Sequence, residues 1–507
     1  MTEVVATRPI PGTPRPYDFP PFRRDRLSNG LRLITVHLPG RPLVTGSLIL
    51  PTGVADEPAD QAGATVLAAR ALSEGTERYD AIALIEATER LGATLHAESG
   101  WDATSASVDV PATRFAAALE LLAEMVARPT FPEAEIERLR DERLNDLLQA
   151  RADPRRRADE AFNETIYARE SPYHRPSGGT KETVARLDGH LLRAAYARVV
   201  DPARATLIVA GDLTGLDVPG IAERLFGSWK ADPSARPPGK VDDRTDVTSR
   251  FVRVIHRPGS VQTEVRIGHR GAPRLIPDFH ALQVMGAILG GLFNSRLNMK
   301  LREEKGYTYG AHAGYDLRRG AGPFGARAAV NTEATVPAIT DFLGELRRIR
   351  DEPVGEDELR AARDFLVGVF PLRFETPGAV VGALSGMVVH DLPDDELSRY
   401  RPAIEAVTQR DVEKAARARL EPDRSAIVLV GDIDAFGRDL EAAGFGPIVI
   451  ERDEAPIAEG PAEGVAEEMG PVDDRGTGPT EGAEGPVDGR IDEPVDASTR
   501  SEVGDGR

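Results

Sequence analysis

Histidines are the first residues to consider, because imidazole binds zinc and transfers protons near neutral pH. Zinc hydrolases commonly use two histidines one helical turn apart, so that both rings reach the same ion. The chain has nine histidines, and no two of them lie three or four residues apart. They are His37, His96, His174, His190, His256, His269, His280, His312 and His390. The spacing therefore offers no helical histidine pair, and isolated histidines are more often core or surface residues than ligands.

Motifs of other enzyme classes are also missing. The sequence has no G-x-S-x-G nucleophile elbow, no Walker A motif and no G-x-G-x-x-G after a strand. The glycines of "GAILGGLFNSRL" (286–297) fit neither phosphate-binding spacing. We interpret that stretch as a loop followed by a helix N-cap at Asn294 or Ser295.

One segment, "SRLNMKLREEKGYTYGAHAGYD" (295–316), does place polar donors near each other. A helical pattern ends at Gly306, a plausible C-cap, and a strand pattern follows. Arg302 lies in the last helical turns, so its guanidinium and the phenol of Tyr309 could converge and donate hydrogen bonds to a carbonyl or a developing oxyanion. The alternative is that Arg302 compensates the helix dipole and Tyr309 packs on a sheet. The alternation predicts one strand face with Tyr307, Tyr309, Ala311, Ala313 and Tyr315.

The elements that would position this segment occur twice. "DPARATLIVAGDLTG" (201–215) and "EPDRSAIVLVGDIDA" (421–435) share Pro, Arg, Gly and Asp at a constant offset of 220 residues. Each is an apolar strand that follows a helical stretch, which indicates duplication of one α+β unit. "LITVHLPGRPLVTGSLILPTG" (33–53) and "RVIHRPGSVQTEVRIGHRG" (253–271) both predict strand pairs at the starts of the two halves.

Strands and helices occur in blocks, which favours an α+β fold with antiparallel sheets packed against helices. Helices are predicted within 112–129, 131–154 and 406–420, and a hairpin within 307–331. We expect an extended N-terminal arm (1–18), an N-terminal domain (19–229), a Pro-rich linker (230–250), a homologous C-terminal domain (251–452) and a disordered acidic tail (453–507).

Composition limits the partners. The formal charge of −19 argues against nucleic acid, although the residues from 451 onward, with 17 acidic and 5 basic side chains, carry −12 of it. No apolar run is long enough to cross a membrane, no signal-peptide pattern is present, and we expect a cytoplasmic location. With no cysteine in the chain, a disulfide or a Cys-ligated metal site is excluded.

The order of segments resembles the insulinase and pitrilysin superfamily of zinc metallopeptidases, in the size class of the processing peptidases. "LSNGLRLITV", "GATVLAARALSEGT", "GSVQTEVRIGHRG" and "NSRLNMKLREEKGYTYGA" carry the resemblance, which spans about 19–450. Catalytic members have H-x-x-E-H on the helix that matches the second of these stretches. The resemblance places Val66 and Arg70 at the histidine positions and Ala69 at the glutamate position, with Asp146 near the third ligand. None of the first three can do that chemistry, and Asp146 is otherwise a solvated helix charge.

The resemblance implies a division of labour. In members built from unlike subunits, one chain holds zinc and its companion supplies an Arg and a Tyr, which match Arg302 and Tyr309 here. We therefore expect a non-catalytic subunit that binds extended peptides, holds no zinc itself, and forms a heterodimer or higher oligomer with an H-x-x-E-H subunit. The short 286–297 stretch, in place of a long glycine-rich loop, is closer to a bacterial companion than to a mitochondrial one. A structural or adaptor homologue without a role in proteolysis is the alternative, whereas the histidine spacing conflicts with a complete zinc peptidase.

Overall fold

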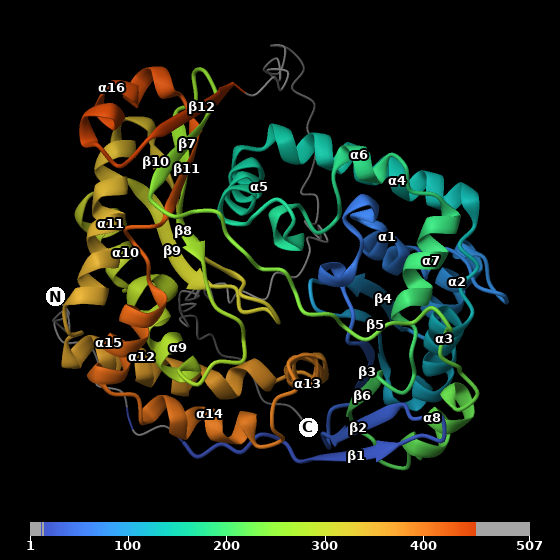
Figure 1. Cartoon of the computed structure of the whole chain (residues 1–507). Coiled ribbons are helices and arrows are strands. Elements are labelled where there is room, and N and C mark those ends of the chain that lie inside the picture. The colour runs from blue at the N-terminus through green and yellow to red at the C-terminus, as the bar shows by residue number, and fades with distance from the viewer. Residues whose placement is uncertain (1–11, 13–14, 453–507) are drawn as a thin grey trace, which may run out of the picture. The chain divides into compact units, whose positions relative to one another are not determined.

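The computed structural model describes residue 12 and residues 15–452, and two six-stranded sheets form its framework (Figure 1). The predicted acidic tail and most of the predicted N-terminal arm lie outside the described residues. Within the arm, Tyr17 stacks on Phe374 with ring centroids 6.3 Å apart. None of the described helices combines the length and apolarity that crossing a bilayer requires.

The N-terminal half forms the first sheet, with the strand order β1-β2-β6-β3-β5-β4. Its strands are β1 (Phe22–Arg26), β2 (Arg32–His37), β3 (Leu43–Leu50), β4 (Thr94–Ser99), β5 (Thr104–Pro111) and β6 (Thr206–Gly211). Its α-helices are α1 (Ala64–Ala71), α2 (Ala81–Arg90), α3 (Phe115–Ala127), α4 (Glu133–Ala152), α5 (Pro154–Ile166), α6 (Lys181–Val184), α7 (Gly189–Val199) and α8 (Val218–Phe226).

The C-terminal half forms the second sheet, with the order β12-β7-β11-β8-β10-β9. Its strands are β7 (Phe251–His256), β8 (Gln262–Arg270), β9 (Thr308–Tyr315), β10 (Pro323–Asn331), β11 (Ala426–Gly431) and β12 (Ile448–Arg452). Its α-helices are α9 (Phe279–Gly286), α10 (Arg296–Asn298), α11 (Thr335–Asp351), α12 (Glu356–Val369), α13 (Pro377–Val389), α14 (Glu396–Glu405), α15 (Gln409–Arg419) and α16 (Ile433–Ala443). Two π-helical segments, η5 (Ala287–Gly291) and η6 (Met299–Glu304), extend α9 and α10.

The two sheets repeat one topology, which confirms the predicted duplication and α+β class. Five strands correspond in order, β2-β6-β3-β5-β4 to β7-β11-β8-β10-β9, and the outermost strand differs because β1 precedes its half and β12 ends it. The sheets are mixed rather than purely antiparallel, since β2 pairs with β6 and β7 with both β11 and β12 in parallel. The antiparallel expectation holds for the remaining pairs.

The two strands predicted at the start of each half are present, but they do not pair with each other as predicted. β2 and β3 both exist, but β6 lies between them, and β11 lies in the same way between β7 and β8. Every residue of β6 and β11 is buried. Such wholly apolar strands belong in a sheet interior rather than at its edge, so the last strand of each unit separates its first two.

Most predicted helices are confirmed, with one correction at 286–291. α3, α4 and α15 lie within their predicted windows, and β9 pairs with β10 antiparallel. The stretch that we interpreted as a loop is helical through Gly291, because Ile288 and Leu289 are buried in the C-terminal core. Burial here outweighs the low helix propensity of glycine. Ser295 does lie at the N-cap position of α10.

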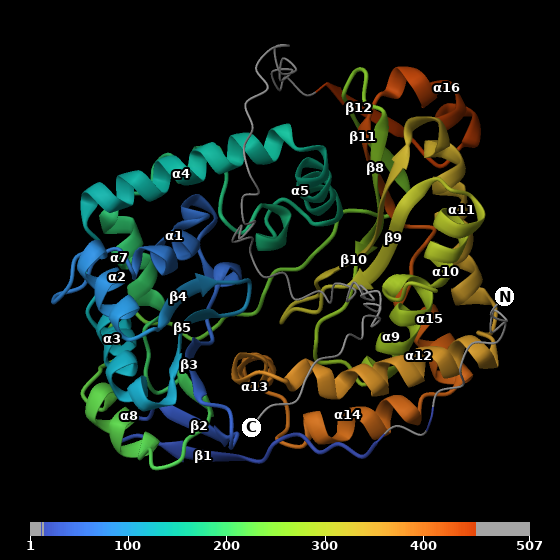
Figure 2. The ribbon, with the colours of Figure 1, turned by 180° about the vertical axis from the view of Figure 1, so that it is seen from behind.

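Each half contributes one helix to the other half's sheet. α5 packs on β8 and β11, and α13 packs on β3 and β6, as Figure 2 shows from behind. Phe162 of α5 is 6% exposed and packs over Gly268 of β8. A Cβ added at Gly268 would lie 2.8 Å from the Phe162 ring. The two halves therefore share their cores, and each sheet depends on a helix from the other half.

Candidate functional site

Arg302 and Tyr309 lie together, at the corner between η6 and β9. The guanidinium carbon of Arg302 is 5.0 Å from the ring centroid of Tyr309 and 4.6 Å from that of Phe293. Tyr309 is 90% exposed and Phe293 is 61% exposed. The cation is thus stacked between two aromatic rings that face solvent, a geometry in which each ring attracts the charge. We call these three residues the Arg–Tyr corner.

The predicted shared face of the strand is wrong for Tyr309. Ala328 pairs with Ala311 and Val330 with Thr308, so β9 has one residue more than β10 between these pairs. This bulge breaks the alternation and moves Tyr309 off the buried face of Ala311, which is 4% exposed. Bulges often re-aim a side chain in this way.

Two polar side chains hold the bulge. The Thr308 hydroxyl donates to the Gly310 carbonyl at 2.9 Å and accepts from the Gly310 N–H at 3.2 Å. Asn298 accepts from the Ala311 N–H at 2.8 Å, and its amide donates to the Leu292 carbonyl at 3.1 Å. The segment that carries Arg302 is π-helical, a form frequent at functional sites. Arg302 Nε lies 3.4 Å from a carboxylate oxygen of Glu303, and both side chains are partly exposed.

The degenerate zinc-motif positions lie on α1, which packs against α4. Ala69 is buried and Val66 half-buried, and neither carries a metal ligand. Arg70 points to α4, where its guanidinium lies 3.1 Å from the carboxylate of Glu142. A guanidinium has no free electron pair for a metal at neutral pH.

Asp146 is the only one of the four positions with a possible ligand atom, and that carboxylate is already paired. Arg156 donates to Oδ1 at 2.9 Å, and Arg143 donates to Oδ2. Burial raises the pKa of Asp146, but the Arg156 hydrogen bond and the Arg143 charge outweigh it, so the net pKa is lowered. A zinc ion would need imidazole or carboxylate ligands at several of these positions. The residues at these four positions do not fit the ion, because three supply no ligand and the fourth is held by two arginines.

Glu57 was not predicted from the sequence as a site residue, and its side chain fixes the start of α1. Its buried carboxylate accepts from the N–H groups of Gly63 at 2.9 Å and Thr65 at 3.1 Å. Burial raises the pKa of Glu57 despite these hydrogen bonds. Gly63 has φ +92°, and an added Cβ would lie 2.6 Å from the Gly178 carbonyl oxygen. The helix is therefore well supported although its zinc motif is absent.

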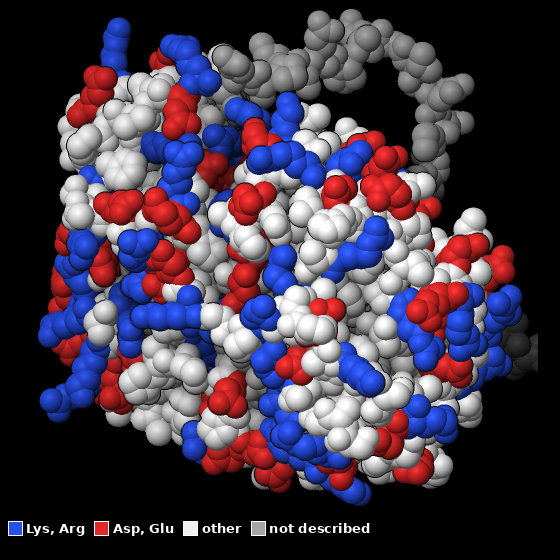
Figure 3. All heavy atoms as spheres, turned by 45° about the vertical axis from the view of Figure 1, so that its right-hand side comes forward, with Lys and Arg blue, Asp and Glu red and all other residues white. Residues whose placement is uncertain are grey.

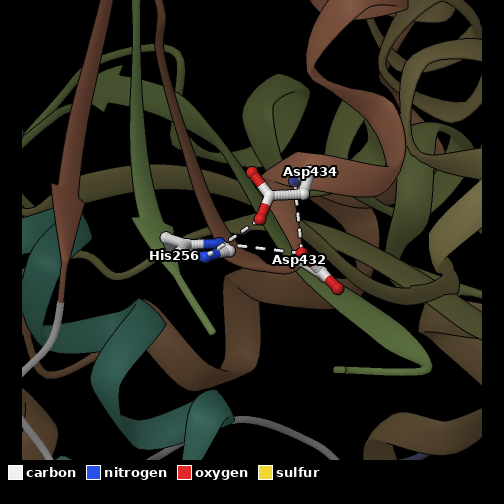
Figure 4. Close-up of side chains that lie close together, drawn as sticks. All are labelled: His256, Asp432 and Asp434. Atoms are coloured by element: carbon white, nitrogen blue, oxygen red, sulfur yellow. Dashed lines mark hydrogen bonds and ion pairs between the residues drawn. The ribbon is translucent and has the colours of Figure 1, made fainter. Parts of the chain in front are cut away.

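His256, Asp432 and Asp434 form one group of possible metal ligands within the described part of the chain (Figure 4). The ring of His256 is 3% exposed, with Nδ1 3.7 Å from Asp432 and Nε2 3.6 Å from Asp434. The Ile433 N–H donates to Nδ1 at 3.3 Å. In the neutral ring Nε2 then carries the proton and faces Asp434.

The equivalent position of the N-terminal half explains this group as a turn support. His37 there accepts from the Leu213 N–H through Nδ1 at 3.1 Å, beside Asp212. Both histidines thus hold the turn after a Gly-Asp strand end, and Thr214 replaces Asp434 in the first copy. The shared geometry assigns His256 to the turn rather than to a metal.

Figure 3 shows how the charged side chains are distributed over one face of the molecule. Acidic and basic side chains are interspersed over the face in Figure 3, without a continuous basic stripe on that face. Many are paired, as Arg138 is with Glu74 at 2.6 Å.

With this geometry established, comparison with known proteins gives the family. Residues 32–180 match the insulinase (peptidase family M16) domain, and residues 187–366 match the peptidase M16 inactive domain. The chain belongs to peptidase family M16. Its duplicated sheets correspond to the two matched domains. The sequence of this M16 chain contains no H-x-x-E-H motif.

Relatives of this M16 chain carry contrasting names. An uncharacterized zinc protease of Streptomyces coelicolor is 26% identical over 78% of this chain and 86% of that protein. A non-peptidase homolog of Helicobacter pylori is 22% identical over 62% of this chain and 72% of that protein. The solved peptidase M16 inactive domain from Pseudomonas fluorescens superposes with a TM-score of 0.75 at 24% identity, over 81% of this chain and 98% of that one. That structural likeness establishes the fold.

Proposed function

We propose that this chain is the non-catalytic companion subunit of a heteromeric M16 zinc peptidase. It binds extended peptides and supplies Arg302 and Tyr309 to the active site of an H-x-x-E-H partner. The observation that carries the proposal is the Arg–Tyr corner, where two hydrogen-bond donors lie side by side and face solvent. The chain's own zinc-motif positions hold no catalytic group.

The corner suits a substrate carbonyl. Arg302 presents several N–H donors in a fixed plane, and Tyr309 presents one O–H donor. Donors of this kind stabilise the oxygen of a peptide bond as it gains negative charge during hydrolysis. A purely structural pair would bury its aromatic surface, whereas Tyr309 and Phe293 leave most of theirs accessible.

Peptide binding is proposed at the edge of the first sheet. β4 is one of the two edge strands of this sheet, and β5 is its only strand neighbour within the described residues. An extended peptide can add to such an edge through main-chain hydrogen bonds, which read backbone more than side chains. Binding of this kind would depend mainly on the peptide backbone.

In this proposal the partner subunit holds the zinc and this chain holds none. Arg70 and Asp146 each pair with oppositely charged groups of α4 and α5, so the ligand set is replaced by ion pairs. Elemental analysis of the purified chain should show much less than one zinc per chain. One tightly held zinc with chelator-sensitive hydrolysis by the chain alone would refute this part.

The kinetic test uses the assembled complex with the H-x-x-E-H subunit that co-purifies with the full chain. Tyr309→Phe keeps the ring beside Arg302 and removes only the hydroxyl. If Tyr309 acts in the transition state, kcat for a fluorogenic peptide should fall by on the order of 100-fold with a smaller change in KM. Arg302→Lys should also be poorly tolerated, because an ammonium lacks the planar fork.

Tyr307→Phe is the matched control, since it makes the same chemical change two residues away on a ring packed against the core. It should leave kcat unchanged, and gel filtration should show complete assembly for every variant. The competing function is a structural adaptor with no role in proteolysis. Unchanged kinetics in the assembled Arg302→Ala, Tyr309→Phe double variant would establish that alternative.

A further inference from the structure

The β4–β5 turn of the first sheet contacts the β9–β10 loop of the second sheet through a hydrogen bond and a cation–aromatic contact. The first is the turn at 100–103, and the second is the loop at 316–322. These hairpins are equivalent in the duplicated topology, and each contains its sheet's outermost strand, β4 or β9. We call their junction the hairpin junction.

Arg318 is at its centre. The guanidinium carbon lies 4.6 Å from the ring centroids of both Trp101 and Tyr173, and the residue is only 7% exposed. Asp316 accepts from its Nε at 2.8 Å, whereas its buried Nη1 has no hydrogen-bond partner. The two aromatic rings are therefore the main surroundings of this cation, apart from one carboxylate.

Hydrogen bonds on both sides extend the contact. The Arg319 N–H donates to Asp102 at 2.8 Å, and its guanidinium donates to both oxygens of Asp56 at 2.9 and 2.8 Å. The Gly320 N–H donates to the Tyr173 hydroxyl at 3.2 Å. Burial raises the pKa of Asp102, while the Arg319 hydrogen bond opposes that shift. Each of these hydrogen bonds links a residue of the 316–322 loop to a residue of the N-terminal half.

This junction has a consequence for the proposed site. Trp101 and Asp102 follow β4 directly, and the loop with Arg318 follows β9, the strand that carries Tyr309. Arg318 is packed between two rings from the other half, and two further loop residues, Arg319 and Gly320, are hydrogen-bonded to that half, so the loop has little freedom to shift. The junction therefore fixes β9 relative to β4, the edge at which we propose that peptide binds.

We infer that Arg318 is a positioning residue, which through Trp101 and Tyr173 sets the separation between the peptide-binding edge β4 and the Arg–Tyr corner. The inference rests on the proposed function for its catalytic consequence, whereas the separation itself can be measured without substrate. Arg318 touches neither substrate nor the reacting atoms.

The absence of native cysteine makes the distance measurement clean. Spin labels at His96→Cys on β4 and Glu304→Cys in η6 occupy exposed positions on the two halves. Pulsed electron resonance should give one narrow distance distribution for otherwise native chain and a broader or shifted one after Arg318→Ala. Arg318→Lys, which keeps the charge but loses the planar stacking, should give an intermediate result. Arg24→Ala is the control, because it removes an exposed ion pair to Asp394 that also joins the halves.

The kinetic arm uses the assembled peptidase and the same fluorogenic peptide. Misplacement of a bound peptide relative to its catalytic donors should lower kcat/KM by on the order of 10- to 100-fold, while Arg24→Ala leaves it unchanged. Circular dichroism confirms folding, and Arg318→Lys replaces Arg318→Ala if the latter does not fold. An unchanged distance distribution in the folded Arg318 variants overturns the inference. A changed distance distribution with unaltered kinetics in the Arg318 variants overturns the catalytic consequence of the inference. Unaltered kinetics in the Arg302 and Tyr309 variants would instead mean that the proposed function fails.

Discussion

His269 offers a test of how the second sheet is stabilised, because its ring is buried and both nitrogens are used. Nδ1 donates to the Arg270 carbonyl at 2.8 Å, and Nε2 accepts from the Glu421 N–H at 3.0 Å. The ring also stacks on Phe324 with centroids 5.1 Å apart. These two hydrogen bonds require the neutral ring with the proton on Nδ1.

His269→Phe keeps an aromatic ring but leaves the Glu421 N–H and the Arg270 carbonyl without these partners. A fully buried unsatisfied group costs about 1–3 kcal/mol. Because these two groups are only partly buried, the free energy of unfolding at pH 7.5 should fall by about 2–4 kcal/mol, the lower part of the sum for two such groups. Urea denaturation followed by circular dichroism measures this loss. His190→Phe, on the exposed side of α7, is the matched control and should change stability little.

The same variant tests the pH dependence. Burial lowers the pKa of His269 below its usual value of 6.5, so the folded protein takes up this proton at lower pH than the unfolded chain does. Its contribution to stability is present above pH 6.5 and is lost as the pH falls through and below that value. The unfolding free energy of the native chain should therefore fall faster between pH 6.5 and 5 than that of His269→Phe, by at most ~1.4 kcal/mol per pH unit. Equal slopes, or undiminished stability of the variant at pH 7.5, would refute this reasoning.

Two further predictions concern the core and the tail. Phe162→Ala should lower the unfolding free energy by about 3–5 kcal/mol, because the Phe162 ring of α5 is buried against the second sheet. Phe365→Ala on α12 removes a half-exposed ring and should cost much less in the same urea titration. Similar losses for both variants would contradict the packing of α5. Truncation after Asp453 should leave the melting temperature nearly unchanged, because the removed sequence has no apolar periodicity, and a large fall would show that the tail boundary is misplaced.

Local sequence patterns predicted the elements well and their arrangement less well. The apolar runs at 206–211 and 426–431 identified strands and the duplication, but the insertion of β6 between β2 and β3 is a long-range pairing. The nearly continuous apolar composition of these two runs was the available sequence signal for a central position in the sheet. The bulge at Tyr309 was missed because strict alternation gives no sign of one extra residue against β10.

In the candidate site, too, contacts between residues close in sequence were predicted and contacts between distant residues were missed. The helix-to-strand change at Gly306 was enough to bring Arg302 near Tyr309 in the prediction, since both residues flank one corner. Phe293 and the hairpin junction were missed, because they depend on contacts across a turn or between the halves. "DLRRGAGP" (316–323) did show two arginines in a hairpin loop, but its partners Trp101 and Tyr173 lie far away in the sequence.

The duplication also explains why the chain can lack a zinc motif and still carry a site. α1 and α2 lie between β3 and the edge strand β4, and α9, η5, α10 and η6 lie between β8 and the edge strand β9, so both candidate sites lie in the helical segment that precedes the edge strand of their half. In the first, Arg70 pairs with Glu142 and Asp146 with two arginines, so its charges are matched internally. In the second, the ion pair of Arg302 with Glu303 is longer, at 3.4 Å, and its guanidinium is stacked on exposed rings. A weakly paired set of donors at the corner gains more from an added carbonyl oxygen than the matched charges of the first half do, and for this reason our proposal places the catalytic contribution of this M16 chain in its C-terminal half.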